Sequence, residues 1–244
     1  LEDRKIKLYD IGYSKSDMLL QGKYDREDVL NQLKLDPALK TVLYSPSWDE
    51  GLSLRTFGAK VIENILKVKN INLIVKLHPI SYCPVDGPNY IFYTGGTDWI
   101  NKFSKFDSIP NFRHIPSNNI DPLLSAADVM VTDLSSVALE FIVLDKPVIY
   151  IDCPEFFEKT LKNTYSNFGD TTAEFVKNDP KANAGRHVGT IVSGPEKLPE
   201  AILNSLENPG ELSDKRKELA ERLSYNPGNA SDTAAEKILN ILGI

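Results

Sequence analysis

The residues best suited to chemistry in this chain follow short apolar runs and are rich in hydroxyl groups. The clearest case is a Thr–Asp–Leu–Ser–Ser run at residues 132–136, which ends an apolar stretch and leads into a helical pattern. The free N–H groups and positive dipole end of a helix start bind phosphate, and the hydroxyls of Thr132, Ser135 and Ser136 add further donors. The alternative is capping of the helix by Asp133 or Ser135. The run therefore predicts either a phosphate site or a helix cap.

A second candidate group lies in the Lys–Leu–His–Pro run at residues 76–79. The proline disfavours helix at His78 and holds that residue in an extended conformation. Beside a diphosphate, its imidazole can supply positive charge or a proton to the leaving phosphate. Lys76 lies on the same side of the strand and is a candidate phosphate cation. The alternatives are a partly buried histidine with a backbone partner and a solvated lysine at the sheet edge.

Two further side chains complete the candidate site. Glu140 follows Ser136 by four residues, on the same helical face, so its carboxylate can accept hydrogen bonds from ribose hydroxyls. Otherwise it is an exposed helix charge. Ser47 follows another apolar run and can contact phosphate, although a turn around Pro46 explains it equally well.

Composition excludes several kinds of partner. The chain has 244 residues, of which 41% are hydrophobic and 25% charged, as in ordinary globular proteins. Its net charge of −6 and the lack of a clustered excess of Lys and Arg argue against nucleic acid. The sequence has no apolar run of about 18 residues, so we expect no transmembrane segment. We likewise expect no secretory leader.

Cofactor motifs are missing from the sequence as well. The two cysteines and three histidines are scattered, without the spacing of a zinc site or a disulfide framework. There is no Walker loop, no G-x-G-x-x-G and no G-x-S-x-G. We therefore expect no metal and no cofactor, and a reduced, cytoplasmic protein whose ligand is a substrate.

The candidate residues are positioned by alternating strand and helix patterns. β-Branched runs predict strands at residues 41–45, 73–77, 112–115, 129–132, 148–151 and 187–192. Helical spacing predicts helices at residues 54–66, 99–106, from 121 onward, and at 135–144, 195–207, 211–224 and 231–243. Residues 79–96, rich in Pro and Gly, are predicted to form a long loop.

This order predicts an α/β fold: a doubly wound, mostly parallel, Rossmann-like sheet of about six strands with a helical C-terminal tail. Ligands of such sheets bind beyond the carboxyl ends of the strands, where all the candidate residues lie. Residues 1–40 are interpreted as a linker leading into the domain, and residues 41–244 as a nucleotide-donor-binding domain.

Taken in order, these segments resemble the carboxyl-terminal half of the CDP-glycerol glycerophosphotransferase family, the teichoic-acid-type primases and polymerases. Residues 76–79 match its K-x-H-P, and residues 127–137 (ADVMVTDLSSV) match its D-V-L-I-T-D-Y-S-S-V core. Residues 12–17 (GYSKSD), 43–48 (LYSPSW), 145–150 (DKPVIY) and 228–238 (GNASDTAAEKI) match more loosely. The similarity spans nearly the whole chain.

The resemblance implies one half of a GT-B transferase, with CDP-glycerol as substrate and its diphosphate on residues 132–136. It implies a catalytic role for His78 and phosphate contacts for Ser135 and Ser136, while Ser47 replaces a phosphate-binding threonine. An acceptor hydroxyl would attack the phosphorus of glycerol phosphate, and CMP would leave. The polymer or lipid-linked acceptor would bind an amino-terminal half that this chain lacks. The isolated chain would then be inactive, and the complete protein would work at the inner face of the cell membrane.

Some positions depart from the family pattern. Leu134 stands where tyrosine is usual, and Ser14 stands where proline is. UDP-sugar glycosyltransferases and epimerases of GT-B fold share the same strand, serine pair, helix and glutamate. Such an enzyme and a non-catalytic nucleotide-binding module therefore remain as alternatives.

Overall fold

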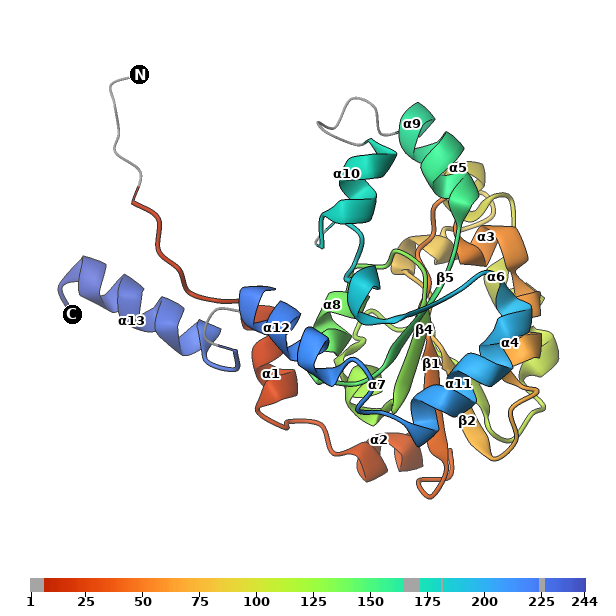
Figure 1. Cartoon of the computed structure of the whole chain (residues 1–244), viewed down its shortest axis with the longest axis horizontal. Helices are drawn as coiled ribbons and strands as arrows, with labels where there is room; N and C mark the ends of the chain where they lie inside the picture. Colours follow the sequence, from red (N-terminus) through yellow and green to blue (C-terminus); the bar gives the residue numbers. More distant parts are fainter. Residues whose placement is uncertain (1–6, 165–171, 181, 224–226) are drawn as a thin grey trace.

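A single parallel sheet forms the centre of the molecule in the computed structural model, which describes residues 7–164, 172–180, 182–223 and 227–244 (Figure 1). Its strands are β1 (Lys40–Tyr44), β2 (Ile71–Val75), β3 (Phe112–His114), β4 (Val129–Thr132), β5 (Val148–Ile151) and β6 (Thr190–Val192). The six strands are ordered β3-β2-β1-β4-β5-β6, and each neighbouring pair is parallel. The predicted doubly wound α/β sheet is therefore confirmed.

Apolar side chains of the strands alternate between two hydrophobic cores, one on each face of the sheet. In β1, Val42 and Tyr44 point into one core and Leu43 into the other. This alternation is the period-2 geometry of a strand, and both faces need cover because the strands are apolar throughout. Residues of α3, α4, α6 and α11 cover the first face, and residues of α1, α2, α7, α8 and α12 cover the second.

The helices follow the predicted order. They are η1 (Ser14–Ser16), α1 (Asp17–Leu20), α2 (Arg26–Gln32), α3 (Ser53–Phe57), α4 (Ala59–Ile65), η2 (Pro79–Tyr82), α5 (Tyr90–Thr94), α6 (Trp99–Phe103), η3 (Ser104–Phe106), α7 (Asp121–Ala126), α8 (Val137–Ile142), η4 (Phe156–Thr160), α9 (Leu161–Thr164), α10 (Ala173–Asn178), η5 (Arg186–Val188), η6 (Pro195–Lys197), α11 (Leu198–Glu207), α12 (Ser213–Leu223) and α13 (Ala230–Leu242). The helical C-terminal tail is thus confirmed.

Two local predictions were wrong. The helix expected over residues 54–66 is broken at Gly58, whose φ of 53° and ψ of −126° do not fit a helix. Residues 79–96 are not one long loop, because η2 and α5 lie within them. The turn signals of Pro and Gly were recognised there, but the short aromatic run at residues 90–94 packs as a helix against η2.

The residues before β1 pack on the domain. Leu30 is fully buried in the core of the second face, where α2 lies against α7. Lys40 then opens β1, the strand at the centre of the sheet. Residues 17–35 therefore contribute buried surface to the same core as the strands.

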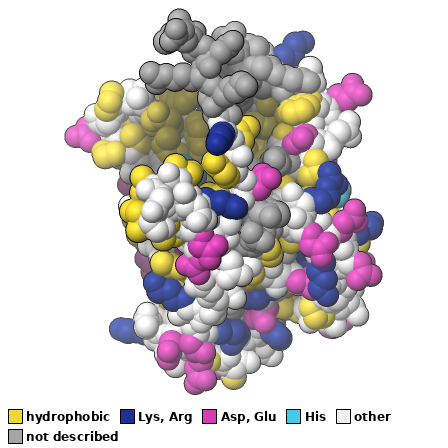
Figure 2. All heavy atoms as spheres, turned by 90° about the vertical axis from the view of Figure 1, so that its left-hand side faces the viewer, with side chains coloured by type: hydrophobic (Ala, Val, Ile, Leu, Met, Phe, Trp, Pro, Cys, Tyr) yellow, Lys and Arg dark blue, Asp and Glu magenta, His cyan; other side chains and the backbone are white. Residues whose placement is uncertain are grey.

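The last helix has a different environment. In Figure 1, α13 and the irregular segment before η1 lie on the same side of the domain, and both project away from the sheet. The apolar side chains at its end, Ile238, Ile241 and Leu242, are more than half exposed. Figure 2 looks onto this side of the molecule, where basic and acidic side chains are interspersed and hydrophobic ones gather.

Candidate active site

The edge of the sheet where β1 and β4 end, called the crevice below, is the expected ligand site of this fold. The strand order reverses direction between these two neighbours, which makes their boundary the topological switch point. Residues 45–48 leave β1 there, and residues 133–136 leave β4 beside them. Two of the segments singled out in the sequence are therefore brought together.

The first half of the turn after β4 is buried. Thr132 is completely inaccessible, and its hydroxyl donates to the Ser45 carbonyl at 2.7 Å. That hydrogen bond ties the end of β4 to the end of β1. The Thr132 side chain predicted to bind phosphate therefore has its proton engaged inside the fold.

Asp133 has an even more enclosed position. Its Oδ1 accepts from the backbone N–H of Ser47 at 2.9 Å and from that of Leu134 at 2.7 Å. Its Oδ2 accepts from the backbone N–H of Ser53 at 3.0 Å and from the Ser53 hydroxyl at 2.6 Å. Complete burial raises the pKa of Asp133, while these hydrogen bonds act in the opposite direction. The carboxylate thus holds the start of α3 and the loop after β1 against the turn, instead of capping α8.

The second half of the turn faces outward. Ser135 is half-buried and Ser136 is exposed, and both lie just before the first residue of α8. Their carbonyls accept from Ala138 and Leu139 in the first helical turn. The two serines therefore stand at the start of α8, where the sequence predicts a phosphate site.

Ser47 reaches the crevice from the β1 side. Its backbone N–H is held by Asp133, and its hydroxyl lies 3.4 Å from Oδ2 of Asp49. Because Asp133 also fixes Leu134, one buried carboxylate sets the distance between the Ser47 loop and the serine turn. Ser47, Ser135 and Ser136 therefore lie on the two segments that leave β1 and β4 at the switch point.

Glu140 lies one turn into α8 and is buried, not exposed. Its Oε1 accepts from Nζ of Lys15 at 2.6 Å, and only 6% of its side chain is accessible. Its Oε2 has no hydrogen-bond partner among the described residues. A buried carboxylate oxygen without a donor is costly. The Tyr13 hydroxyl is close to this carboxylate: burial raises the pKa of Tyr13, and Glu140 raises it further.

Lys76 is buried too, contrary to a solvated position at the sheet edge. It is 4% accessible, and its Nζ donates to the Leu77 carbonyl at 3.0 Å. Burial lowers the pKa of Lys76, and the positive charge of Lys15 lowers it further. Two ammonium groups from distant parts of the sequence therefore act on the same crevice.

His78 is exposed at the carboxyl end of β2. Its Nδ1 accepts from the backbone N–H of Ile80 at 3.3 Å, which is the backbone partner considered above. Partial burial of the imidazole lowers the pKa of His78, and the positive charge of Lys76 lowers it further. With Nδ1 as acceptor, the proton of the neutral ring lies on Nε2, which becomes a donor.

Lys15 is the site residue that the sequence did not single out. It belongs to the segment at residues 12–17, whose likeness to a family motif was noted without a role for any side chain. Asp17, at the end of this segment, accepts from the backbone N–H of Ala230 at 3.1 Å and of Ser231 at 2.7 Å. The first and last motif-like segments are therefore joined, and the join holds Lys15 beside α8.

Another motif-like segment, at residues 145–150, has a structural position. The ammonium of Lys146 donates to the carbonyls of Leu124, Ser125 and Ala127 at the end of α7. A lysine at a helix C-terminus satisfies carbonyls that lack intrahelical partners. Burial lowers the pKa of Lys146 to about 8.

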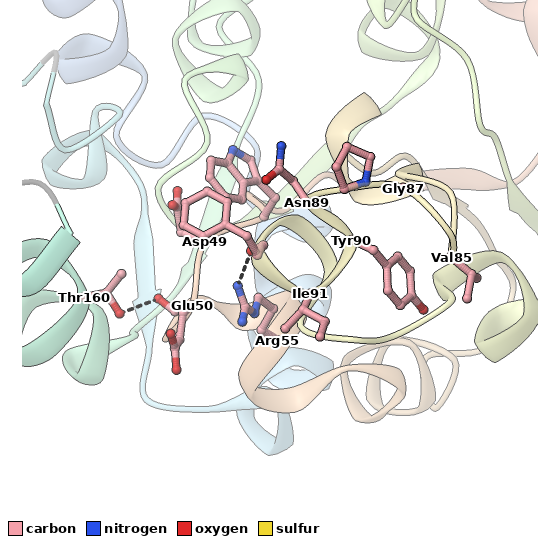
Figure 3. Close-up of a pocket in the computed structure, with 12 residues that line it drawn as sticks. Asp49, Glu50, Arg55, Val85, Gly87, Asn89, Tyr90, Ile91 and Thr160 are labelled. Atoms are coloured by element: carbon pink, nitrogen blue, oxygen red, sulfur yellow. Dashed lines mark hydrogen bonds between the residues drawn. The ribbon is translucent and has the colours of Figure 1, made fainter.

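A cavity of about 620 Å³ opens to one side of the crevice (Figure 3). It lies between residues 48–50 and the region around α5, with Thr160 donating to the Glu50 carbonyl at its edge. Arg55, below α5 in Figure 3, donates to the Phe92 carbonyl. None of the predicted site residues lines this cavity, and the crevice is the better candidate because the sheet topology and the polar groups converge there.

No helix of the described part is long and apolar enough for a membrane span. Among the same residues, His, Cys, Asp and Glu side chains form no group of three or more that could hold a metal ion.

Comparison with known proteins gives a consistent result. The sequence model of the family described as CDP-Glycerol:Poly(glycerophosphate) glycerophosphotransferase matches residues 3–240. A teichoic acid glycerol-phosphate primase of Bacillus spizizenii is 27% identical over 143 residues, covering 57% of this chain and 32% of the primase. A teichoic acid poly(glycerol phosphate) polymerase of Staphylococcus epidermidis is 25% identical over 170 residues, covering 66% of this chain and 22% of the polymerase.

Solved structures agree on the fold. A structure of the wall teichoic acid polymerase TagF has a TM-score of 0.61 at 18% identity, covering 95% of this chain and 51% of TagF. Another TagF structure, obtained after a 15 minute soak with CDPG, has a TM-score of 0.59 at 16% identity, over 94% of this chain and 48% of the other. The chain therefore spans about a third or less of the two curated relatives and about half of TagF. Since the family model covers nearly all of it, this chain belongs to the CDP-glycerol:poly(glycerophosphate) glycerophosphotransferase family.

Proposed function

We propose that this chain is the donor-binding half of a transferase that moves glycerol phosphate from CDP-glycerol to a hydroxyl acceptor. Family membership supports the reaction class, and the TagF structure soaked with CDPG supports the donor by analogy. The observation that carries the proposal is the switch point, where Asp133 joins the loop that carries Ser47 to the turn that carries Ser135 and Ser136. Glu140, in the helix that follows, has one carboxylate oxygen without a hydrogen-bond partner among the described residues.

Each residue has a role that its position supports. The hydroxyls of Ser135 and Ser136 and the N–H groups at the start of α8 bind the diphosphate, and Ser47 contacts it from the β1 side. Lys76 supplies positive charge from within the crevice wall. The free oxygen of Glu140 accepts a hydrogen bond from the ribose.

The reaction is an in-line displacement at phosphorus. The acceptor hydroxyl attacks the phosphorus of glycerol phosphate and loses its proton, the bond from that phosphorus to the bridging oxygen breaks, and CMP leaves with the electron pair. Catalysis of this kind depends on positioning and on stabilisation of charge on the leaving phosphate. The Nε2–H of His78 is suited to donate to that phosphate.

The acceptor is proposed to bind outside the residues of this chain. We propose a polymer or lipid-linked hydroxyl compound, presented by the remainder of the transferase. This arrangement implies work in the cytoplasm at the inner face of the cell membrane. The isolated chain would then bind donor without turning it over.

Ligand-dependent melting tests the donor. The chain is heated alone and with CDP-glycerol, CMP, a UDP-sugar and ADP, each at the same excess. A ligand present at about 100 times its Kd stabilises the folded state by about 2.7 kcal/mol, which is a measurable shift in Tm. We expect the largest shift with CDP-glycerol. A preference for uridine nucleotides would replace the proposal with a UDP-sugar enzyme.

The catalytic residue is tested in the complete transferase. We expect His78→Ala to abolish turnover of CDP-glycerol while the Kd for CDP-glycerol changes little. His114→Ala is a matched control, because this histidine pairs with the Tyr82 hydroxyl at 2.9 Å at the end of β3 and has no proposed role. Near-normal turnover in His78→Ala would remove this imidazole from the mechanism.

A further inference from the structure

Lys15 reaches the candidate donor site from a distant part of the sequence. It lies in η1, 125 residues before Glu140, yet its Nζ is 2.6 Å from the Glu140 carboxylate. Helical side chains lean toward the N-terminus of their helix, so Glu140 and its bound ammonium lean toward Ser136 one turn earlier. The Lys15 charge therefore lies beside the turn that presents the serine hydroxyls.

The two partners of this ion pair differ in freedom. The Glu140 side chain is 6% accessible, whereas that of Lys15 is 53% accessible. Ion pairs with one exposed partner are weak, and a lysine ammonium moves easily on its four-carbon stem. Because Oε2 of Glu140 has no partner among the described residues, Lys15 satisfies the carboxylate only in part. The lysine is thus the partner that is able to leave.

Lys15 is held in the charged form by its neighbours, since burial acts to lower its pKa but Glu140 outweighs this and raises it. Glu140 is the carboxylate in direct contact with Lys15, and the Lys15 charge in turn lowers the pKa of Lys76. Tyr13 also faces this group, and Asp121 contributes a weaker opposing charge. A diphosphate between the two ammonium groups would relieve their repulsion.

The backbone that carries Lys15 is held in place. Asp17 receives two backbone hydrogen bonds from the start of α13, at 3.1 and 2.7 Å. Burial acts to raise the pKa of Asp17, but the bonds from Ser231 and Ala230 outweigh it and lower that pKa, which keeps the carboxylate charged. Only the Lys15 side chain therefore has to move on ligand binding.

We propose, on the basis of the donor site above, that Lys15 is a phosphate-binding residue which Glu140 holds beside the turn in the unliganded chain. When the donor binds, the Lys15 ammonium transfers from the carboxylate to a diphosphate oxygen. Glu140 is then free to accept from the ribose hydroxyls with both oxygens. The site thus exchanges an internal ion pair for one with its ligand.

The test is a titration of Lys15→Met with cytidine, CMP and CDP-glycerol by calorimetry. A charge-assisted hydrogen bond lost from the phosphates should weaken CDP-glycerol binding about tenfold or more, CMP binding less, and cytidine binding not at all. Lys15→Arg should bind CDP-glycerol within about threefold of the wild type, because a guanidinium also binds phosphate. Lys60→Met removes the same charge from the exposed face of α4 and should leave all three affinities unchanged.

Two outcomes contradict the proposal. Unchanged affinity of Lys15→Met for CDP-glycerol excludes a phosphate contact, and an equal loss for cytidine shows that Lys15 supports the fold or the nucleoside. A wild-type chain that binds neither CMP nor CDP-glycerol refutes the donor site itself, and with it the role of Lys15. Melting curves of each unliganded variant separate these results from a failure to fold.

Discussion

The two halves of the turn after β4 can be compared directly, because they are adjacent in sequence and differ in environment. Thr132 and Asp133 are completely buried, and their side chains satisfy groups from β1, the loop after it and α3. Ser135 and Ser136 are partly or fully accessible at the start of α8. The first pair holds the ends of β4 and β1 together, whereas the second pair is accessible and is the pair proposed to bind the donor.

Within this run of five residues, the first two side chains are buried and bind neighbouring elements, whereas the last two are accessible at the start of α8. Leu134, between the pairs, packs against the hydrophobic core of the first face and anchors the change in direction. The run singled out in the sequence therefore mixes accessible residues, which are proposed to bind the donor, with buried residues that shape the backbone around them. Substitutions in the two halves should consequently affect different measurements.

The largest effect is expected for Asp133→Ala. The substitution leaves three buried backbone donors and the Ser53 hydroxyl without their acceptor, so we expect a loss of about 3 kcal/mol or more in the free energy of unfolding. Urea denaturation measures this loss. Asp133→Asn retains one acceptor oxygen and should lose less. Wild-type stability in Asp133→Ala would show that the loop after β1 is held by other contacts.

Replacement of the exposed pair should have the opposite profile. In the double variant Ser135→Ala with Ser136→Ala, the free energy of unfolding in urea should stay within about 0.5 kcal/mol of the wild type, as for most accessible positions. The Kd for CDP-glycerol should rise about tenfold, because two donors to the phosphates are lost. Calorimetric titration measures the change. An unchanged Kd would remove these hydroxyls from the site.

Thr132→Val should have a smaller effect, and the effect should be on stability and not on donor binding. The substitution keeps the shape of the side chain but leaves the Ser45 carbonyl without its hydroxyl partner, at a cost of about 1 kcal/mol. The Kd for CDP-glycerol should remain within about twofold in the same titration. A large loss of affinity with normal stability would place the threonine hydroxyl on the ligand after all.

The smallest effect concerns the titration of His78. Because burial and the Lys76 charge lower the pKa of His78, its NMR titration midpoint should lie below the ordinary value of 6.5, so the ring is neutral at pH 7. CDP-glycerol should raise the midpoint, since a nearby diphosphate stabilises the imidazolium. The rise should be smaller in the double serine variant. An NMR titration midpoint that is unchanged by CDP-glycerol would show that His78 does not lie beside the phosphates.

The sequence predicted the strands better than the environment of the charged residues. All six strands were located to within a few residues, because β-branched apolar runs and turn signals are local in the chain. The break at Gly58 and the helix α5 were missed, since each depends on packing against neighbours as much as on local pattern.

The charged side chains were harder for a physical reason. For both Glu140 and Lys76, an exposed side chain was one of the two interpretations, whereas both side chains are buried. Glu140 owes this partly to Lys15, which comes from more than a hundred residues earlier and leaves no periodic signal. The division of roles in the turn after β4 was also invisible, because the partners of Asp133 lie on other elements.

The link between Asp17 and the start of α13 has a consequence for how the protein can be shortened. It spans more than two hundred residues of sequence, and Gln21 adds a second connection, to the Gly228 carbonyl. A version trimmed before residue 228 would keep every strand, yet it would release the segment that places an ammonium group on Glu140. The final helix therefore helps to hold a residue at the opposite end of the polypeptide in register with the crevice.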